Sequence, residues 1–171
     1  MKNLLLAFLL LVMASVAQGQ AHTPQQVVDD FYQAYFERIH QQQKLVDLEI
    51  GYSSAFAALI VRNATVCEAH GEGPCGWGSY GDEHFQGAQE YESRLSLERA
   101  GYRSEVLDVG AVRVRFNIYP SIKNAHGFYE VDMTYQMILE DGEWRVDDIR
   151  YRGGHTARGR IKAEIESLLA N

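Results

Sequence analysis

The chain has 171 residues, of which 46% are hydrophobic and 23% charged, and this is the composition of an ordinary globular domain. It contains 23 acidic and 16 basic residues, which gives a formal net charge of −7. An acidic surface argues against binding to nucleic acid or to anionic membranes, because both interactions need lysine and arginine side chains to neutralise phosphates.

The first 21 residues have the three parts of a secretory signal peptide. Lys2 gives a positive start, and residues 4–13 form an apolar run that is too short to span a bilayer. Small residues follow, with usable cleavage sites before Gln18 and before His22. We therefore expect export to the periplasm or the medium, no membrane insertion after cleavage, and a single domain over residues 22–171.

The first half of the remaining chain predicts helices. Residues 23–26, Thr-Pro-Gln-Gln, have the sequence of a capping box with proline at the first helical position. Apolar residues then recur at helical spacing, which predicts an amphipathic helix over about 24–43. A second helix is expected to start at Ser53 or Ser54 and to end near His70.

The two cysteines, Cys67 and Cys75, are expected to pair. An oxidising compartment and an even number of cysteines favour a disulfide, which would contribute about 2–3 kcal/mol on the chain-entropy model. Two free thiols or a metal site are the alternatives. A zinc site needs about four ligands, and only His70 and His84 lie near the cysteines in the sequence.

Residues 71–88 contain six glycines and predict a long loop, a type of segment that is often functional. The segment follows a helix and carries acids, so its glycines do not form a phosphate-binding fingerprint. Its aromatic side chains suit protein recognition, although they could equally fold back over the core. The candidate residues for binding a partner are Trp77, Tyr80, Asp82, His84 and Phe85. Asp82 could instead cap a short helix at 83–90.

In the second half, the hydrophobic period changes from 3.6 to 2. Residues 112–118 and 129–139 alternate apolar and polar side chains, which predicts two strands that each bury one face. Residues 101–108 predict an earlier strand. Asp141-Gly142 is typical of a hairpin turn and leads into a last strand over 143–151.

A change of phase within the last strand predicts a β-bulge at Asp147-Asp148. Residues 160–170 predict a closing helix. Helices followed by an antiparallel meander indicate an α+β fold, with N-terminal helices packed on a curved sheet of about four strands and a C-terminal helix. The side chains expected to be buried are Phe31, Tyr35, Val114, Phe116, Val131, Met133, Trp144 and Val146.

Four parts of the chain together resemble a family of uncharacterised exported bacterial proteins with a cystatin-like, nuclear-transport-factor-two-like fold. They are the capped first helix, the segment 81–89, the strand 111–116 and the segment 142–151, in this order. The resemblance spans about residues 24–169. The family pattern has a proline where Glu83 stands, whereas the acid expected at Glu90 is kept. The family has no known function, but some related exported proteins protect bacteria from toxins of their neighbours.

Folds of this shape often enclose a pocket between the sheet and the first helix. The residues that could line it are Tyr32, Tyr35, Tyr129, Met133, Tyr135 and Asp148, and the alternative is that the aromatic and methionine side chains are plain core. Asp147 and Asp148 could form a carboxylate pair for acid–base chemistry. Otherwise one aspartate is exposed and the other pairs with Arg113, Arg115 or Arg150.

No catalytic motif rises above background in this sequence. Ser79 has Trp77 where a nucleophile elbow needs glycine, and the polar run 82–84 lacks the spacing of a metal site. We expect no catalytic residue, no metal and no cofactor. The sequence predicts an exported periplasmic binding protein for a protein partner, with an immunity or inhibitor role as one form. The alternative is a small-molecule enzyme or ligand-binding protein that uses the pocket. The oligomeric state stays open.

Overall fold

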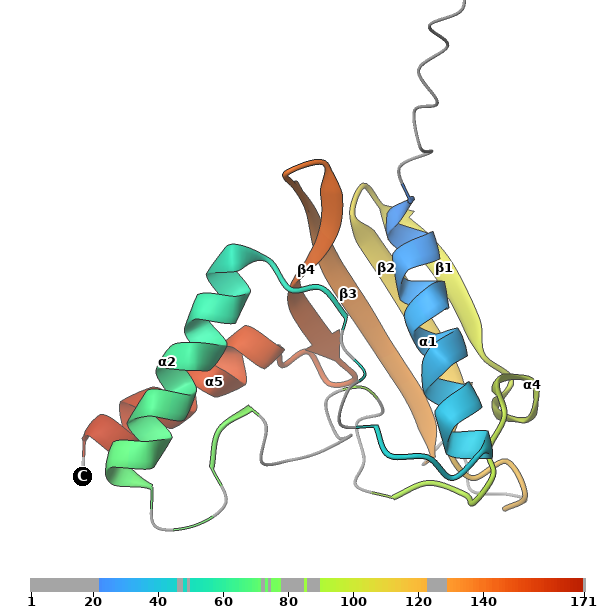
Figure 1. The fold of residues 1–171 in the computed structure, drawn as a ribbon, viewed down its shortest axis with the longest axis horizontal. Helices are drawn as coiled ribbons and strands as arrows, with labels where there is room; N and C mark the ends of the chain where they lie inside the picture. The colour runs from blue at the N-terminus through green and yellow to red at the C-terminus, as the bar shows by residue number, and fades with distance from the viewer. Residues whose placement is uncertain are drawn as a thin grey trace, which may run out of the picture.

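The computed structural model describes residues 22–45, 48, 50–71, 73, 75–77, 85, 90–122 and 129–170. These residues form the predicted α+β fold, in which helices accompany a curved four-stranded antiparallel sheet (Figure 1). The elements are α1 (Pro24–His40), α2 (Ser54–His70), α4 (Leu97–Ala100), β1 (Arg103–Asp108), β2 (Ala111–Asn117), β3 (Glu130–Glu140), β4 (Glu143–Tyr151) and α5 (Ala157–Leu169).

The strands follow one another in the order β1-β2-β3-β4, and α1 lies across one face of the sheet (Figure 1). Helices α2 and α5 pack mainly on each other, beside β4. The first helix thus covers the sheet as predicted, whereas the second helix extends the molecule beyond it. Among the described helices, none is both long and apolar enough to cross a membrane.

Helix α1 begins as its sequence predicts. The Thr23 hydroxyl accepts a hydrogen bond from the Gln26 backbone N–H, and the Gln26 side chain returns one to the Thr23 N–H, with Pro24 in the first turn. The helix ends at His40, slightly before the predicted end. Its buried stripe consists of Val28, Phe31, Tyr32, Tyr35, Phe36 and Ile39.

The core lies between this stripe and the facing side of β2, β3 and β4. Every second side chain of β2 and β3 is buried there, which confirms the predicted strand phase. Trp144 is the exception among the side chains expected to be buried, because it is only partly buried. Trp144 pairs with Leu139 near the tip of the β3–β4 hairpin, where both side chains leave the covered part of the sheet.

The predicted β-bulge in β4 is confirmed. Val146 pairs with Met137 and Asp148 with Gln136, so Asp147 is the extra residue. Both aspartates of the bulge hold the start of α5. Asp147 Oδ1 accepts hydrogen bonds from the Ser53 hydroxyl and the Arg158 guanidinium, each at 2.6 Å.

Asp148 Oδ1 accepts the Arg158 backbone N–H at 3.0 Å. The cationic partner in this region is therefore Arg158, not Arg113, Arg115 or Arg150 as expected. The reason is that the bulge turns Asp147 toward the α2–α5 side, away from the strand neighbours that supply the other arginines.

Candidate functional site

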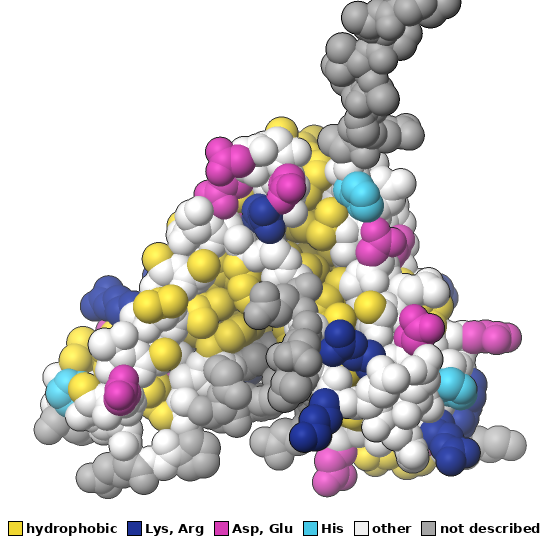
Figure 2. Space-filling model, viewed as in Figure 1, with side chains coloured by type: hydrophobic (Ala, Val, Ile, Leu, Met, Phe, Trp, Pro, Cys, Tyr) yellow, Lys and Arg dark blue, Asp and Glu magenta, His cyan; other side chains and the backbone are white. Residues whose placement is uncertain are grey.

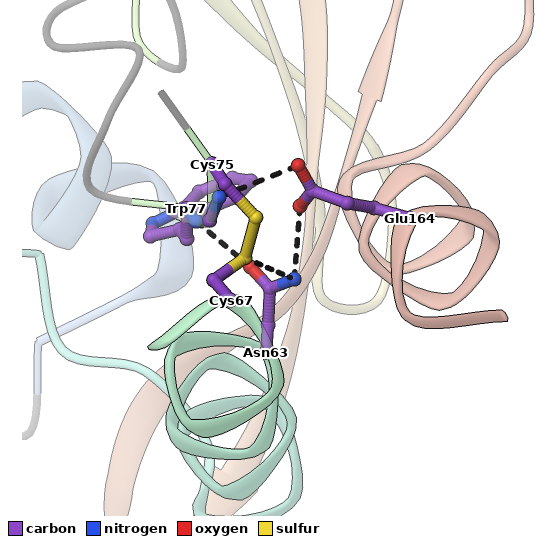
Figure 3. Close-up of a disulfide and its surroundings, with 6 residues drawn as sticks. Asn63, Cys67, Cys75, Trp77 and Glu164 are labelled. Atoms are coloured by element: carbon purple, nitrogen blue, oxygen red, sulfur yellow. Dashed lines mark hydrogen bonds between the residues drawn. A yellow bond between two sulfur atoms is a disulfide. The ribbon is translucent and has the colours of Figure 1, made fainter. Parts of the chain in front are cut away.

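The disulfide between Cys67 and Cys75 is confirmed, with its two sulfur atoms 1.98 Å apart (Figure 3). Cys67 lies in the last turn of α2, and Cys75 lies eight residues later in the segment that leaves this helix. The bond therefore fixes the start of the glycine-rich segment to the end of α2. We call residues 75–77 the disulfide-anchored segment.

Two further side chains tie this segment to both helices of the α2–α5 pair (Figure 3). Asn63 of α2 is fully buried, and its amide nitrogen donates to Glu164 Oε2 of α5 at 2.9 Å. Asn63 Oδ1 accepts the Trp77 backbone N–H at 2.9 Å, and Glu164 Oε1 accepts the Gly76 N–H at 3.3 Å. Each of these buried polar groups has a partner, so the cluster is a structural junction.

The Trp77 ring does not project into solvent. It packs edge-on against Phe56, with ring centroids 5.5 Å apart, and against Tyr52 at 6.4 Å. The ring is partly buried and belongs to the layer around the core. Gly76, whose φ is +86°, turns the chain so that the ring faces α2. The alternative that this aromatic residue folds back over the core describes its position better than an exposed contact does.

Phe85 is also turned inward. Its ring lies 4.8 Å from that of Phe31, and its carbonyl oxygen accepts a hydrogen bond from the Tyr32 hydroxyl at 2.7 Å. Tyr80, Asp82 and His84 lie outside the described residues, as does nearly all of the short helix predicted at 83–90. The role of the loop in binding a partner stays a prediction.

The described residues contain one group with donor atoms close enough for a metal ion, namely Cys67, Cys75 and Glu164, within 4.8 Å of one another. Both sulfur atoms are used in the disulfide and cannot ligate a metal as thiolates. The Glu164 carboxylate accepts two hydrogen bonds from the junction. This group therefore acts as a covalent and polar clasp between α2, α5 and the segment.

Four of the six pocket candidates belong to the core, namely Tyr32, Tyr35, Met133 and Tyr135. The hydroxyls of Tyr32 and Tyr135 lie 2.9 Å apart, and since the Tyr32 hydroxyl donates to the Phe85 carbonyl, it accepts the proton of Tyr135. Burial is the main cause that raises the pKa of both phenols well above the ordinary value, so both stay neutral. This arrangement stabilises the packing of α1 on β3.

The other two pocket candidates lie elsewhere. Tyr129 packs against Tyr119, with ring centroids 4.9 Å apart, at the start of β3. Asp148 holds the α5 junction described above. These two side chains therefore lie away from the buried tyrosine pair, and a ligand pocket built by all six residues stays a prediction.

A second candidate site lies at one end of the sheet, where the β1–β2 turn and the tip of the β3–β4 hairpin meet beside the start of α1 (Figure 1). Five of the eight exposed large apolar side chains of the described residues gather here, so their exposure is concentrated and not scattered. We call them the sheet-end surface. They are Val106, Leu107, Val109, Ile138 and Leu139.

Backbone contacts hold the β1–β2 turn against the β3–β4 hairpin. The Gly110 carbonyl oxygen accepts the Met137 N–H at 2.6 Å. A Cβ atom at Gly110 would lie 2.3 Å from the Met137 oxygen and 3.4 Å from the Trp144 ring. Glycine is therefore required at position 110, because the Met137 carbonyl lies too close for a Cβ atom. Its neighbour Val109 lies on this closely packed turn and is 88% exposed.

A groove of about 460 Å³ adjoins this surface on the α1 side. Val27 of α1 and the Trp144 ring give it apolar walls, and the ion pair between Glu143 and Arg145 borders it. His22, Gly51 and Gly142 complete the lining. Trp144 pairs with the exposed Leu139, so the groove lies next to this member of the sheet-end surface.

Sequence reasoning missed this site. One signal was present, because the three consecutive apolar residues 137–139 break the alternation of β3 just before the Asp141-Gly142 turn. A second was Val109, an apolar residue directly before the turn glycine Gly110. Neither signal reveals that the β1–β2 turn touches the β3–β4 hairpin, since this contact depends on the strand register.

Comparison with family models, with curated proteins and with solved structures finds no match for this chain. The resemblance to the exported family therefore stays a prediction, and the function is inferred from the geometry of the molecule.

Proposed function

We propose that this protein is an exported binding protein that holds a protein partner through the sheet-end surface and the adjoining groove. The observation that carries the proposal is the concentration of exposed apolar side chains at one end of the sheet. Single exposed apolar residues are ordinary on any protein, whereas a contiguous exposed apolar patch is typical of an interaction site.

The surface has the physical properties of a protein interface. Its apolar side chains stand on paired strands and a tight turn, so little conformational entropy is lost when a partner binds. Trp144, which is partly buried and lines the groove, is the kind of residue that dominates binding energy in interfaces.

Export is the second part of the proposal. The signal-peptide pattern of the first 21 residues supports it, and so does the intramolecular disulfide, because disulfides persist in oxidising compartments. A periplasmic or secreted location would expose the sheet-end surface to proteins of the envelope or of neighbouring cells.

A paired-variant experiment tests the binding function. The double variant Val109→Ser/Leu139→Ser removes the two most exposed apolar side chains of the surface without touching the core. Immobilised wild-type protein is used to isolate the partner from an envelope extract, and the affinity of the purified partner is then measured for each variant. We expect the double variant to bind at least tenfold more weakly, a loss of about 1.4 kcal/mol.

Val61→Ser is the matched control, because Val61 is 66% exposed in the middle of α2 and belongs neither to the sheet-end surface nor to the groove lining. We expect it to bind as the wild type does, and both variants to keep the wild-type melting temperature. Equal affinity of the wild type and the double variant would refute a binding role for the surface.

A further inference from the structure

The sheet-end surface is surrounded by acidic side chains, and this bears on the kind of partner it fits. The two tips, residues 106–112 and 137–146, contain four acids and one arginine. The acids are Asp108, Glu140, Asp141 and Glu143. Figure 2 shows several acidic side chains and a single basic one around the apolar strip at this end of the molecule.

The acids of the tips differ in the charges that already face them. Glu143 forms an ion pair with Arg145, and Glu140 accepts the backbone N–H of Ser54 at the start of α2. Among the described residues, Asp108 accepts a hydrogen bond from the backbone N–H of its neighbour Val109, and Asp141 is exposed at the hairpin turn. Asp108 and Asp141 are thus the two acids that can receive a cation from outside.

The start of α1 does not cancel this negative charge. Asp30 lies there with its carboxylate 3.3 Å from the His22 ring. An amino terminus created by cleavage before His22 would add one positive charge, which the Asp30 carboxylate would balance. The end of the sheet therefore stays negative beside its apolar centre.

We propose that the partner presents basic side chains next to an apolar one, so that the apolar side chain enters the groove at Trp144 and the basic side chains face Asp108 and Asp141. This inference rests on the proposed function and adds the chemistry of the partner. Complementary charge around an apolar centre speeds association and selects the partner. A second copy of this chain fits poorly, because it would bring the same acids together.

Three peptides of equal length serve as probes, and each carries a fluorescent label. The first alternates lysine and leucine, the second glutamate and leucine, and the third lysine and serine. Anisotropy titration at low salt should show the lysine–leucine peptide binding at least tenfold more tightly than either of the others. Raising the salt concentration should weaken its binding, because exposed charges are screened.

Two double variants with the same net charge separate the effect of acids at the sheet end from general attraction to an acidic protein. Asp108→Asn/Asp141→Asn removes the two acids of the tips, whereas Glu68→Gln/Glu166→Gln removes two exposed acids from α2 and α5. We expect Asp108→Asn/Asp141→Asn to lower the affinity for the lysine–leucine peptide at least fivefold. We expect Glu68→Gln/Glu166→Gln to leave this affinity unchanged. Equal weakening by both pairs would show mere attraction to an acidic protein and would overturn the inference.

The remaining outcomes distinguish the inference from the proposed function. Tight binding of the glutamate–leucine peptide that Val109→Ser/Leu139→Ser abolishes would overturn the charge inference but keep the binding surface. If Val109→Ser/Leu139→Ser changes the affinity for none of the peptides, the sheet-end surface does not bind them, and the proposed function is wrong. Binding to phosphatidylcholine vesicles that depends on the same two residues would overturn a protein partner. Sedimentation of the wild type as a dimer and of this variant as a monomer would assign the surface to a second copy.

Discussion

At the residue scale, a buried valine of β2 and an exposed valine of the turn before it give the sharpest test of the fold. Val114 of β2 is fully buried between the sheet and α1. Val114→Asp would place an unpaired charge in the core and should destabilise the protein by about 3–5 kcal/mol. Val109→Asp, at an exposed position of the next turn, should change stability by less than about 0.5 kcal/mol. Chemical denaturation of both variants checks this, and similar losses would contradict the strand phase.

Asp132 gives a second prediction at this scale, because Arg113 holds its carboxylate in two hydrogen bonds of 2.8 and 2.6 Å. These bonds lower the pKa of Asp132 from 3.8. A lowered pKa stabilises the fold at every pH above about 4, and this stabilisation is lost as the pH falls below that value.

Asp132→Asn should therefore cost about 1 kcal/mol at pH 7, and the difference from the wild type should close below pH 4. Glu130→Gln, at an exposed position of the same strand, is the control and should show no such closure. Urea melts between pH 3 and 7 provide the measurement. A difference that persists unchanged at pH 3 would contradict the prediction.

At the scale of elements, two turn glycines with similar backbone angles should respond differently to the same substitution. Gly142 has a φ of +82° and open space around its Cα, so Gly142→Ala should cost about 1 kcal/mol from backbone strain alone. Gly110 has a φ of +76° and touches the Met137 carbonyl, so Gly110→Ala should cost about 3 kcal/mol. Thermal unfolding compares the two variants, and equal losses of stability would mean that the β1–β2 turn is not packed against β3 and Trp144.

The disulfide-anchored segment gives a further prediction for an element. Because Trp77 packs on Phe56 and Tyr52, Trp77→Ala should destabilise the protein by about 2–3 kcal/mol. Cys67→Ser/Cys75→Ser should remove about 2–3 kcal/mol through the chain entropy of the open segment. Denaturation curves of both variants test this. Wild-type stability of Trp77→Ala would show that the ring is a surface group.

Local signals explain which elements could be predicted. The capping box at Thr23, the change of period before β2 and the phase slip at Asp147 each arise from a few adjacent residues, and the structure confirms each of them. Helix α4 has only four residues, too few to establish a hydrophobic period, and no sequence signal was read there. The Asp147–Arg158 pair joins β4 to α5 across a turn, so residue type alone could not choose this arginine among the alternatives.

For the whole molecule, the fold followed from sequence periodicity, but the sheet-end surface did not. Trp144 has the sequence position of a buried residue in its strand, yet it lies where the β3–β4 hairpin extends beyond helix α1. The alternation of apolar and polar residues cannot predict where the helix stops covering the sheet. The surface exists only because the register of β2 and β3 places the β1–β2 turn against Met137, close to the end of the β3–β4 hairpin. Long-range register is the physical reason that this site was missed.

Site-specific photo-crosslinking tests the central claim, that the sheet end holds a protein partner, most directly. A photoreactive amino acid is placed at position 109 in one variant of the full chain and at position 61 in another, and both are illuminated in producing cells. We predict a covalent adduct with one partner protein from position 109 and none from position 61. Adducts of equal yield from both positions, or an adduct from position 61 alone, would contradict the claim.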